Sequence, residues 1–400
     1  MTGTVDTTRR AMLDVAVVGG GLCGLALARN LILRGRHVSV FEARPRLGGR
    51  IETTERSRHD LGAAWYWPDT QPLMRQLVRE LGLRALPQHE SGNLLVAAAP
   101  SDGVRAVALG QVGSAARRLE GGMTTLIDAL AQDLPSDRVH LGHVLTAVIQ
   151  KPRGVELHFL RDGKLEIITA RRVVLALPPR LVAERVRFEP ALNTSLRRTL
   201  LRTPTWMATE AKVVATYDAP SWRSAGHSGS AFVCHPDAVL DELFDACEPR
   251  SGLAALGGFV ALSPAERGCL RAELPALISR QLREVFGDAL HERDQSYRDW
   301  ATELHTCSLR DRHEHGLRPE RATYGAPELR YARWDDRLFL GGSETSEVEG
   351  GYLEGALHAA QRITRELTHL DTAPARPAIV SLRPALAHPR WDTLASLLSA

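Results

Sequence analysis

The sequence predicts a protein of the α/β plus α+β class, in which a discontinuous domain of the βαβ type is split by an inserted mixed-sheet domain. Two glycine-rich segments predict the split domain, at residues 19–24 and 341–351. Each follows a short apolar strand and comes before a helix, as in a nucleotide-binding βα turn. Residues 139–177 and 211–262 contain strand-like runs of apolar residues.

The two terminal segments are therefore expected to fold together around a different middle section. The tail carries many prolines and alanines and is expected to strap onto the surface, with a short helix at 391–398. The predicted boundaries are 11–66, 118–188 and 333–368 for the discontinuous Rossmann-like domain, 67–117 and 189–332 for the inserted domain, and 369–400 for the tail.

The first glycine segment matches the dinucleotide-binding fingerprint G-x-G-x-x-G. Residues 14–18 predict a buried strand, and residues 22–33 predict the helix after the turn. Gly19 permits the tight turn, Gly21 lets a pyrophosphate approach the backbone, and Gly24 lets the helix pack on the strand. The free amides and the dipole of the helix N-terminus would then hold the phosphates.

A second strand and an acidic residue complete this fingerprint. Residues 38–41 predict the strand, and Glu42 follows it, 18 residues beyond Gly24. An acid at this offset typically binds a ribose hydroxyl of the dinucleotide. A glycine turn used only for packing is the alternative, and it explains neither the second strand nor the acid.

Composition excludes several classes of protein. The net charge of +3 and the dispersed arginines argue against a nucleic-acid-binding surface. The sequence contains no run of 18 apolar residues, so no membrane span is predicted. The apolar run behind Arg9 and Arg10 is the first strand of the nucleotide fold, so we expect a cytoplasmic protein rather than a secreted one. A homodimer is left open.

Cysteine and histidine patterns predict neither a disulfide framework nor a metal site. The five cysteines are scattered and form no C-x-x-C motif. Cys23 lies at a helix N-terminus, where a thiolate is favoured, but a small packed side chain is the preferred interpretation. The sequence HEH at 313–315 lies in a charged stretch and is expected to be a solvated loop.

Lysine is rare, which makes one lysine conspicuous. Of the 50 basic residues only three are lysines, and Lys151 and Lys164 lie in polar turns. Lys212 instead precedes the apolar run 213–215, where a lysine is costly unless it is paired or used. The alternative is a strand-end lysine that reaches water.

The remaining pattern predicts individual elements. Asp162 and Gly163 predict a hairpin turn, Gly35 ends the first helix, and Thr124 or the glycines before it cap the helix that follows. Helices are expected at 72–81, 123–131, 264–286 and 352–367, and strands at 139–141, 144–149, 155–160, 165–168, 173–177, 211–217, 254–262 and 337–340.

Taken in order, these motifs resemble those of the FAD-dependent amine oxidases, which include monoamine, polyamine and L-amino-acid oxidases and the flavin histone demethylases. The resemblance covers residues 13–368. Residues 46–50 (RLGGR) are similar to the family's second and more specific signature. Similar segments also occur at 119–123 (LEGGM), 173–178 (VVLALP), 340–344 (LGGSE) and 351–356 (GYLEGA).

The resemblance implies FAD, which we expect to be bound noncovalently because the spacing around Cys307 does not match a covalent attachment. Val144 would present its backbone to the adenine, and Glu344 would contact the ribityl or phosphate region. The helix after Tyr352 would direct its N-terminus at the flavin. The implied cofactor-binding residues are Gly19, Gly21, Gly24, Glu42, Ala43, Arg44, Gly49, Arg50, Gly62, Ala63, Val144, Gly342, Glu344, Gly351 and Tyr352.

The resemblance also implies three catalytic residues. Lys212 is similar to the lysine that holds a water against flavin N5, where a cation stabilises superoxide. Tyr352 resembles one wall of an aromatic cage, whose second wall is expected to be incomplete or rebuilt because Ser308 is not aromatic. Trp65 stands where amino-acid oxidases carry a carboxylate-binding arginine, and its ring suits a cation or a flat apolar group.

The implied reaction is the oxidation of a small-molecule amine. Hydride would pass from the α-carbon to flavin N5, the product would be an imine, and O2 would become H2O2. The alternatives are a flavin-dependent desaturase or dehydrogenase, an L-amino-acid oxidase, and a flavoprotein that only binds partners. Hydrogen peroxide production and reduction by amines distinguish these alternatives.

Overall fold

The computed structural model describes residues 12–98, 103–108, 115–314 and 324–372. The compact unit that ends at Thr364 contains two large sheets, and residues from Arg365 onwards belong to a second unit. The short helix predicted at 391–398 lies outside the described residues. Within the described ranges, no helix is both long enough and apolar enough to cross a membrane.

The first sheet has eight strands, and the predicted nucleotide-binding strands form its centre. Strand β1 (Leu13–Val18) pairs in parallel with β2 (Val38–Phe41) and with β10 (Lys164–Leu175), and β10 pairs in parallel with β17 (Leu338–Leu340). Strand β1, near the start of the described chain, and strand β17, more than 300 residues later, therefore flank β10 in one sheet. The other strands are β7 (Val139–His140), β8 (Val144–Lys151), β9 (Gly154–Arg161) and β11 (Arg187–Glu189).

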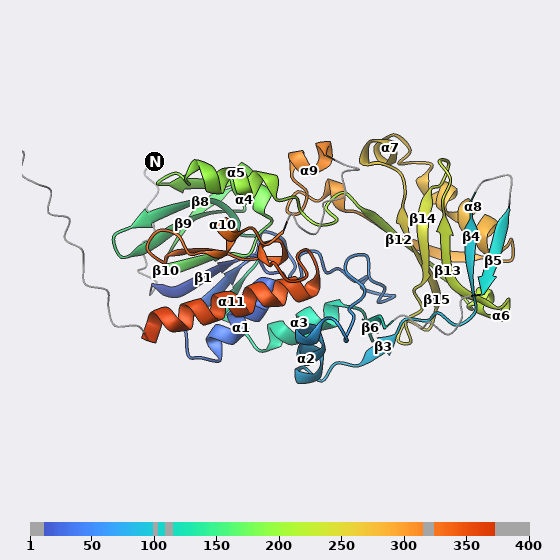
Figure 1. The fold of residues 1–400 in the computed structure, drawn as a ribbon, viewed down its shortest axis with the longest axis horizontal. Coiled ribbons are helices and arrows are strands. Elements are labelled where there is room, and N and C mark those ends of the chain that lie inside the picture. Colours follow the sequence, from blue (N-terminus) through green and yellow to red (C-terminus); the bar gives the residue numbers. More distant parts are fainter. Residues whose placement is uncertain (1–11, 99–102, 109–114, 315–323, 373–400) are drawn as a thin grey trace, which may run out of the picture. The chain divides into compact units, whose positions relative to one another are not determined.

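Helices cover both faces of this sheet. Figure 1 shows α1 (Leu22–Ile32) on one face and the pair α4 (Pro179–Arg185) and α5 (Thr194–Arg202) on the other. Gly24 allows the close approach of α1, since a Cβ there would lie 1.9 Å from the Gly19 carbonyl oxygen. The predicted α/β class is confirmed.

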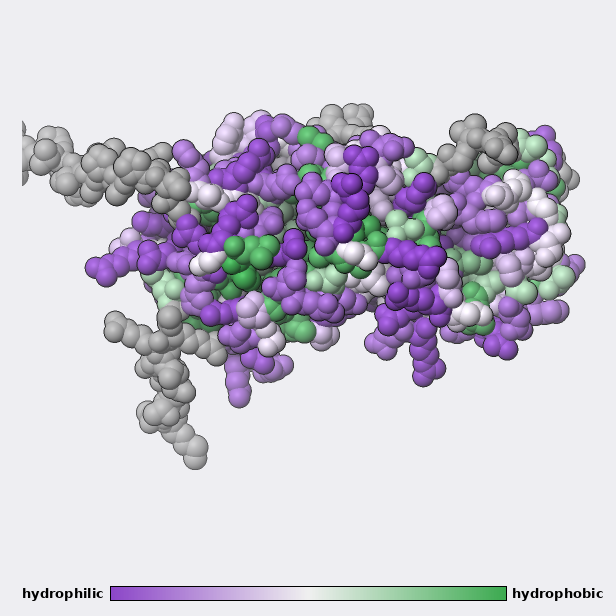
Figure 2. Space-filling view, turned by 90° about the horizontal axis from the view of Figure 1, so that it is seen from below, coloured by the Kyte–Doolittle hydropathy of each residue, from purple (hydrophilic) through white to green (hydrophobic). Residues whose placement is uncertain are grey.

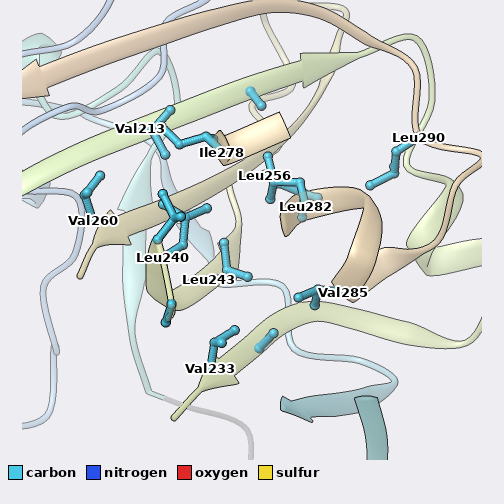
Figure 3. Close-up of a cluster of buried hydrophobic side chains, with 14 of the residues drawn as sticks. Val213, Val233, Leu240, Leu243, Leu256, Val260, Ile278, Leu282, Val285 and Leu290 are labelled. Carbon is cyan, nitrogen blue, oxygen red and sulfur yellow. The ribbon is translucent and has the colours of Figure 1, made fainter. Parts of the chain in front are cut away.

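The second sheet has seven strands and builds the middle of the chain. Its order is β16-β12-β15-β14-β13-β4-β5. One face packs on α8 (Leu274–Phe286) through residues such as Val213, Leu256 and Ile278 (Figure 3). The strands are β4 (Asn93–Ala97), β5 (Val104–Ala108), β12 (Ala211–Tyr217), β13 (His227–Val233), β14 (Leu240–Asp245), β15 (Ala254–Val260) and β16 (Glu292–Asp299).

Two predicted elements differ in the structure. The single helix expected at 264–286 is two helices, α7 (Pro264–Cys269) and α8. Pro275 explains the break, because proline fits the first turn of a new helix but not the interior of a continuing one. The strands expected at 165–168 and 173–177 are one strand, β10, because β9 pairs with its first half and β1 with its second.

The predicted cap of helix α3 (Thr124–Gln132) is wrong. The N-cap residue is Met123, which makes no side-chain capping hydrogen bond, and Thr124 is already the first residue of the helix. Asp60 Oδ1 instead accepts a hydrogen bond from Met123 N at 2.8 Å, and Thr53 Oγ1 accepts one from Thr124 N at 3.1 Å. A loop about 70 residues earlier in the chain therefore satisfies the helix N-terminus.

The other elements connect the two sheets or border them. Hydrophilic side chains predominate on the face shown in Figure 2, and hydrophobic side chains gather there only in small groups. The remaining helices and strands are α2 (Pro72–Glu80), β3 (Ala85–Pro87), β6 (Arg117–Leu119), α6 (Ser221–Ser224), α9 (Leu309–His313), α10 (Pro327–Arg330) and α11 (Leu353–Thr372).

Candidate functional site

A cavity of about 1410 Å³ extends between the glycine turn of the first sheet and one face of the second. It exceeds the roughly 300–1,000 Å³ typical of a site for one drug-sized ligand, so it has room for a long cofactor and a substrate. Every predicted catalytic and cofactor-binding residue lines this cavity except Gly24, which lies at the contact between α1 and β1.

The predicted ribose acid lies beside the glycine turn. Glu42 is buried at the end of β2, and its carboxylate accepts hydrogen bonds from Gly20 N at 2.7 Å and from Arg44 N at 2.9 Å. The Arg44 guanidinium donates to Thr306 Oγ1 at 2.7 Å. These contacts hold the carboxylate in a fixed position at the cavity wall, as recognition of a ribose requires.

The N-terminus of α1 is available for an anion. No side chain caps this helix, and its first turn contains no acidic residue. Gly21 faces the loop of Gly48 and Gly49, whose φ angles of +101° and +59° favour glycine. A Cβ at Gly21 would come no closer than 3.9 Å to neighbouring atoms, so the backbone there is open to a ligand.

An ion pair at the cavity wall joins Arg50 and Glu344, which are far apart in the sequence. Arg50 Nη1 lies 2.7 Å from Glu344 Oε1, and the Glu344 side chain is almost completely buried. Trp206 N donates to Glu344 Oε1 at 3.1 Å, and Arg50 donates to the Trp206 carbonyl at 3.0 Å. The resemblance places Glu344 near the ribityl or phosphate region, and its partner in the structure is Arg50.

One buried hydroxyl in the wall has no protein partner. Thr205 Oγ1 makes no hydrogen bond to the protein. The residue is buried, with 4% of its surface exposed, and it lines the cavity. The backbone of the same residue is fixed, because Thr205 N donates to Asp311 Oδ1 at 3.0 Å. A buried hydroxyl of this kind is costly unless a ligand or water satisfies it.

Lys212 is the buried cation of the second sheet. Its side chain is among the largest fully buried in the described chain, and Nζ donates to the Gly62 carbonyl at 3.0 Å. Burial, with a smaller contribution from Arg118, lowers the pKa of Lys212 to about 8, whereas Asp60 and Glu242 oppose the shift. Near neutral pH the side chain therefore remains largely protonated.

Tyr352 lies among aromatic rings that the sequence did not predict. The Trp206 ring lies at 5.3 Å and 37° from the Tyr352 ring, and Trp67 lies at 6.4 Å and 81°. Gly351 makes room for Trp206, because a Cβ there would lie 2.7 Å from Trp206 Cγ. Cys307 and Ser308, near which the resemblance implies the second wall of the aromatic cage, are buried and do not line the cavity.

Trp65 lines the cavity next to Lys212. The indole Nε1 donates to Gln88 Oε1 at 2.8 Å, which fixes the orientation of the ring. Lys212 Nζ lies 4.8 Å from the centroid of this ring. Trp65 therefore contacts the buried lysine as well as the cavity.

The other sequence candidates take structural roles. Cys23 is buried, burial raises the pKa of its thiol to about 11, and Sγ accepts a hydrogen bond from Gly342 N at 3.2 Å. Glu314 of the HEH sequence pairs with Arg310 at 2.7 Å, and residue 315 lies outside the described ranges. Within those ranges, no group of three or more potential ligands could hold a metal ion.

Sequence reasoning missed four residues of this site: Thr205, Trp206, Phe244 and Phe259. None belongs to a motif, and they come from a loop and two different strands. Gly351, Gly257 and Gly258 lie where a bulky side chain approaches the backbone. A glycine in the sequence does not indicate which side chain approaches it.

The fold and the cavity are those of a dinucleotide-binding protein with a second sheet beside its predicted cofactor site. The chain matches the family model of the flavin containing amine oxidoreductases over residues 92–368 and that of an NAD(P)-binding Rossmann-like domain over residues 17–81. The chain therefore belongs to the flavin containing amine oxidoreductase family.

Curated and solved relatives agree with this assignment. The chain is 23% identical to flavin-containing amine oxidase B of Homo sapiens, covering 89% of this chain and 86% of that protein. A wild-type putrescine oxidase bound to putrescine has the same fold, with a TM-score of 0.73, 20% identity, and coverage of 90% of this chain and 99% of that one. Cyclohexylamine oxidase from Brevibacterium oxydans gives a TM-score of 0.72 at 20% identity, covering 90% of this chain and 100% of that one.

The cofactor of this family is FAD, and the residues of the cavity fit it. The uncapped N-terminus of α1 suits a pyrophosphate, and Glu42 suits a ribose. The unpartnered Thr205 hydroxyl offers a further polar contact. The site thus combines an uncapped helix N-terminus, a buried carboxylate and space for a second molecule.

Proposed function

We propose that this flavoenzyme oxidises a small-molecule amine to an imine at its α-carbon and reduces O2 to H2O2. The observation that carries the proposal is Lys212, a buried cation in the wall of the cofactor cavity. FAD, when bound, would supply the acceptor for the hydride and the electrons for oxygen. Water would then hydrolyse the imine to an aldehyde or ketone with release of ammonia or an amine.

The aromatic residues of the cavity support an amine substrate. Tyr352, Trp206 and Trp67 present ring faces and edges to one region of the wall, where apolar surface favours a neutral amine over water. The fold neighbours include a putrescine oxidase and a cyclohexylamine oxidase, both of which act on amines. Trp65 in place of an arginine argues against a free α-amino acid.

The electrostatics of Lys212 support oxygen as the electron acceptor. A positive charge held in a desolvated site stabilises the anion formed when oxygen takes up an electron, without reorganisation of the site. The hydrogen bond to the Gly62 carbonyl fixes the ammonium group. Noncovalent attachment of FAD is part of the proposal, since Cys307 does not line the cavity.

We further propose how the two sheets share the work. The segments that build the eight-stranded sheet would bind FAD, and those that build the seven-stranded sheet would bind the substrate. The domain boundaries follow this division, with 11–66, 118–188 and 333–368 on the FAD side.

Anaerobic reduction by an amine panel tests the function. Purified holoenzyme is mixed without oxygen with a monoamine, a diamine and an L-amino acid, and bleaching of the flavin spectrum is recorded. We expect an amine to bleach the flavin and readmitted air to restore the colour with stoichiometric H2O2. Bleaching without H2O2 would favour a dehydrogenase, and bleaching by the amino acid alone an amino-acid oxidase.

The titration of Lys212 predicts a pH profile for the oxygen reaction. The pKa of Lys212 is about 8, so the ammonium form predominates below this pH and disappears above it. The second-order rate of reoxidation should be highest and constant well below this pKa and fall as the pH rises through about 8. Stopped-flow reoxidation of the reduced enzyme measures it, and a rate that rises through this range would contradict the role of the cation.

A further inference from the structure

Three aromatic rings surround the ammonium group of Lys212. Nζ lies 4.8 Å from the ring centroid of Trp65, 5.1 Å from that of Phe244 and 5.5 Å from that of Phe259. These distances are within the roughly 6 Å over which a ring face attracts a cation. We call the three rings the Lys212 enclosure.

The register of the second sheet brings these residues together. Lys212 on β12 is the direct cross-strand partner of Phe259 on β15, so both side chains lie on one face of the sheet. Their neighbours Val213 and Val260 point to the opposite face, into the cluster against α8 (Figure 3). Alternation along the strands thus separates the core of this sheet from the enclosure.

A glycine lets the Phe244 ring reach the lysine. Phe244 on β14 pairs with Gly257 on β15, and Gly257 pairs in turn with Val214 on β12. A Cβ at position 257 would lie 2.2 Å from the Phe244 ring. The ring therefore lies across the backbone of β15 in the space that a side chain at 257 would take.

The rings also pack on one another. Trp65 meets Phe244 edge to face, with centroids 4.6 Å apart, and the Phe244 and Phe259 centroids are 6.1 Å apart. Gln88 fixes the Trp65 ring of the enclosure. Gln88 Oε1 accepts a hydrogen bond from Trp65 Nε1, and Gln88 Nε2 donates one to the Asp245 carbonyl at 2.8 Å. The enclosure is therefore a fixed structure rather than a chance contact.

We propose that Trp65, Phe244 and Phe259 are positioning residues, which hold the Lys212 ammonium against the Gly62 carbonyl and keep it charged although it is buried. The inference deepens the proposed function, because it rests on Lys212 as the cation of the oxygen reaction. It gives Trp65 a second role, as a wall of the lysine site.

The enclosure acts together with charged groups on the surrounding elements. Asp60 and Glu242 favour the ammonium form, whereas Arg118 and the loss of water oppose it. Arg298 is the cross-strand neighbour of Lys212 on β16, and its Nε donates to Glu52 at 2.8 Å, so its charge is largely offset. Because burial opposes the charge, the attraction of the three ring faces adds to that of Asp60 and Glu242 in keeping Lys212 protonated.

Lysine scarcity allows a direct test on the holoenzyme. The chain has only three lysines, so labelling lysine with ¹³C and ¹⁵N gives three side-chain signals, and Lys212→Met assigns the buried one. In the wild type we expect the Lys212 ε-methylene protons to be shifted upfield of those of Lys151 and Lys164 by the ring currents of the enclosure. We also expect Lys212 to titrate near pH 8.

Variants then measure the contribution of each ring. Phe259→Leu keeps the apolar volume but removes the ring, and it should lower the titration midpoint by about half to one unit. Phe244→Leu should act in the same direction, and Phe259→Tyr should keep a midpoint near that of the wild type. Phe159→Leu, in the core of the first sheet, is the matched control and should not move it.

The outcomes separate this inference from the proposed function. A midpoint unchanged in both Leu variants, or Lys212 protons that coincide with those of the exposed lysines, would overturn the enclosure. The ring-current shift is measured on the wild type and needs only the Lys212→Met assignment, so it decides even if a leucine variant fails to fold. Because both readouts are taken without turnover, they stand if Lys212→Met leaves reoxidation unchanged, a result that would refute the oxygen role alone.

Discussion

Lys212→Met is expected to slow reoxidation of the reduced enzyme by oxygen about 100-fold, the size of effect seen when one preorganised electrostatic contact is lost. Methionine has similar length and fills the same apolar space, so the enclosure should remain packed. The charge alone is removed, and with it the stabilisation of the anion formed from oxygen. FAD content and anaerobic reduction by the amine should change only a few-fold.

Double-mixing stopped flow makes this measurement. The enzyme is reduced with one equivalent of amine and then mixed with buffers of increasing oxygen concentration. Lys164→Met, at the exposed first residue of β10, is the matched control and should behave as the wild type. Equal reoxidation rates in the two variants would remove Lys212 from the oxygen reaction.

Glu42→Ala is expected to yield mostly apoprotein, with FAD bound about 100-fold more weakly. The carboxylate orders the glycine turn through Gly20 N and Arg44 N, and it is the group placed to receive the ribose hydroxyls. Hydrogen bonds to a charged group contribute roughly 1.5–3 kcal/mol each, and Gly20 N would also lose its partner. The absorbance ratio at 450 and 280 nm of the purified protein reports occupancy, and fluorescence titration with FAD gives the Kd.

Two further variants interpret the loss. Glu42→Gln keeps the size and one acceptor and should lie between the alanine variant and the wild type. Glu284→Ala removes an exposed carboxylate on α8, far from the cavity, and should retain full FAD. Full occupancy in Glu42→Ala would contradict the ribose assignment, provided circular dichroism shows the variant to be folded.

The features predictable from sequence are those encoded locally. The turn at Gly19 and the acid at Glu42 need only a strand, a helix and a fixed offset, so the motif predicts them. Lys212 was identifiable because lysine is rare in this chain and stands beside a buried strand. Gly163 similarly predicts its hairpin, which the structure places between β9 and β10.

The features that sequence did not predict depend on register and on distant partners. Phe244 and Phe259 reach Lys212 only because β12, β15 and β14 align as they do. Trp206 meets Tyr352 across 146 positions, with no motif to connect them. Local periodicity decides which face a residue takes on its own strand, but not which residues of other strands share that face.

The ion pair between Arg50 and Glu344 has a consequence for the order in which the molecule matures. Its partners are separated by 294 positions, and the loop at Trp206 lies between them in sequence. Such remote contacts form late, because closing a long loop costs entropy before any contact rewards it. During synthesis, the wall that holds these groups is incomplete until residue 344 has left the ribosome. The complete wall of the cofactor cavity therefore requires a chain synthesised at least as far as Glu344.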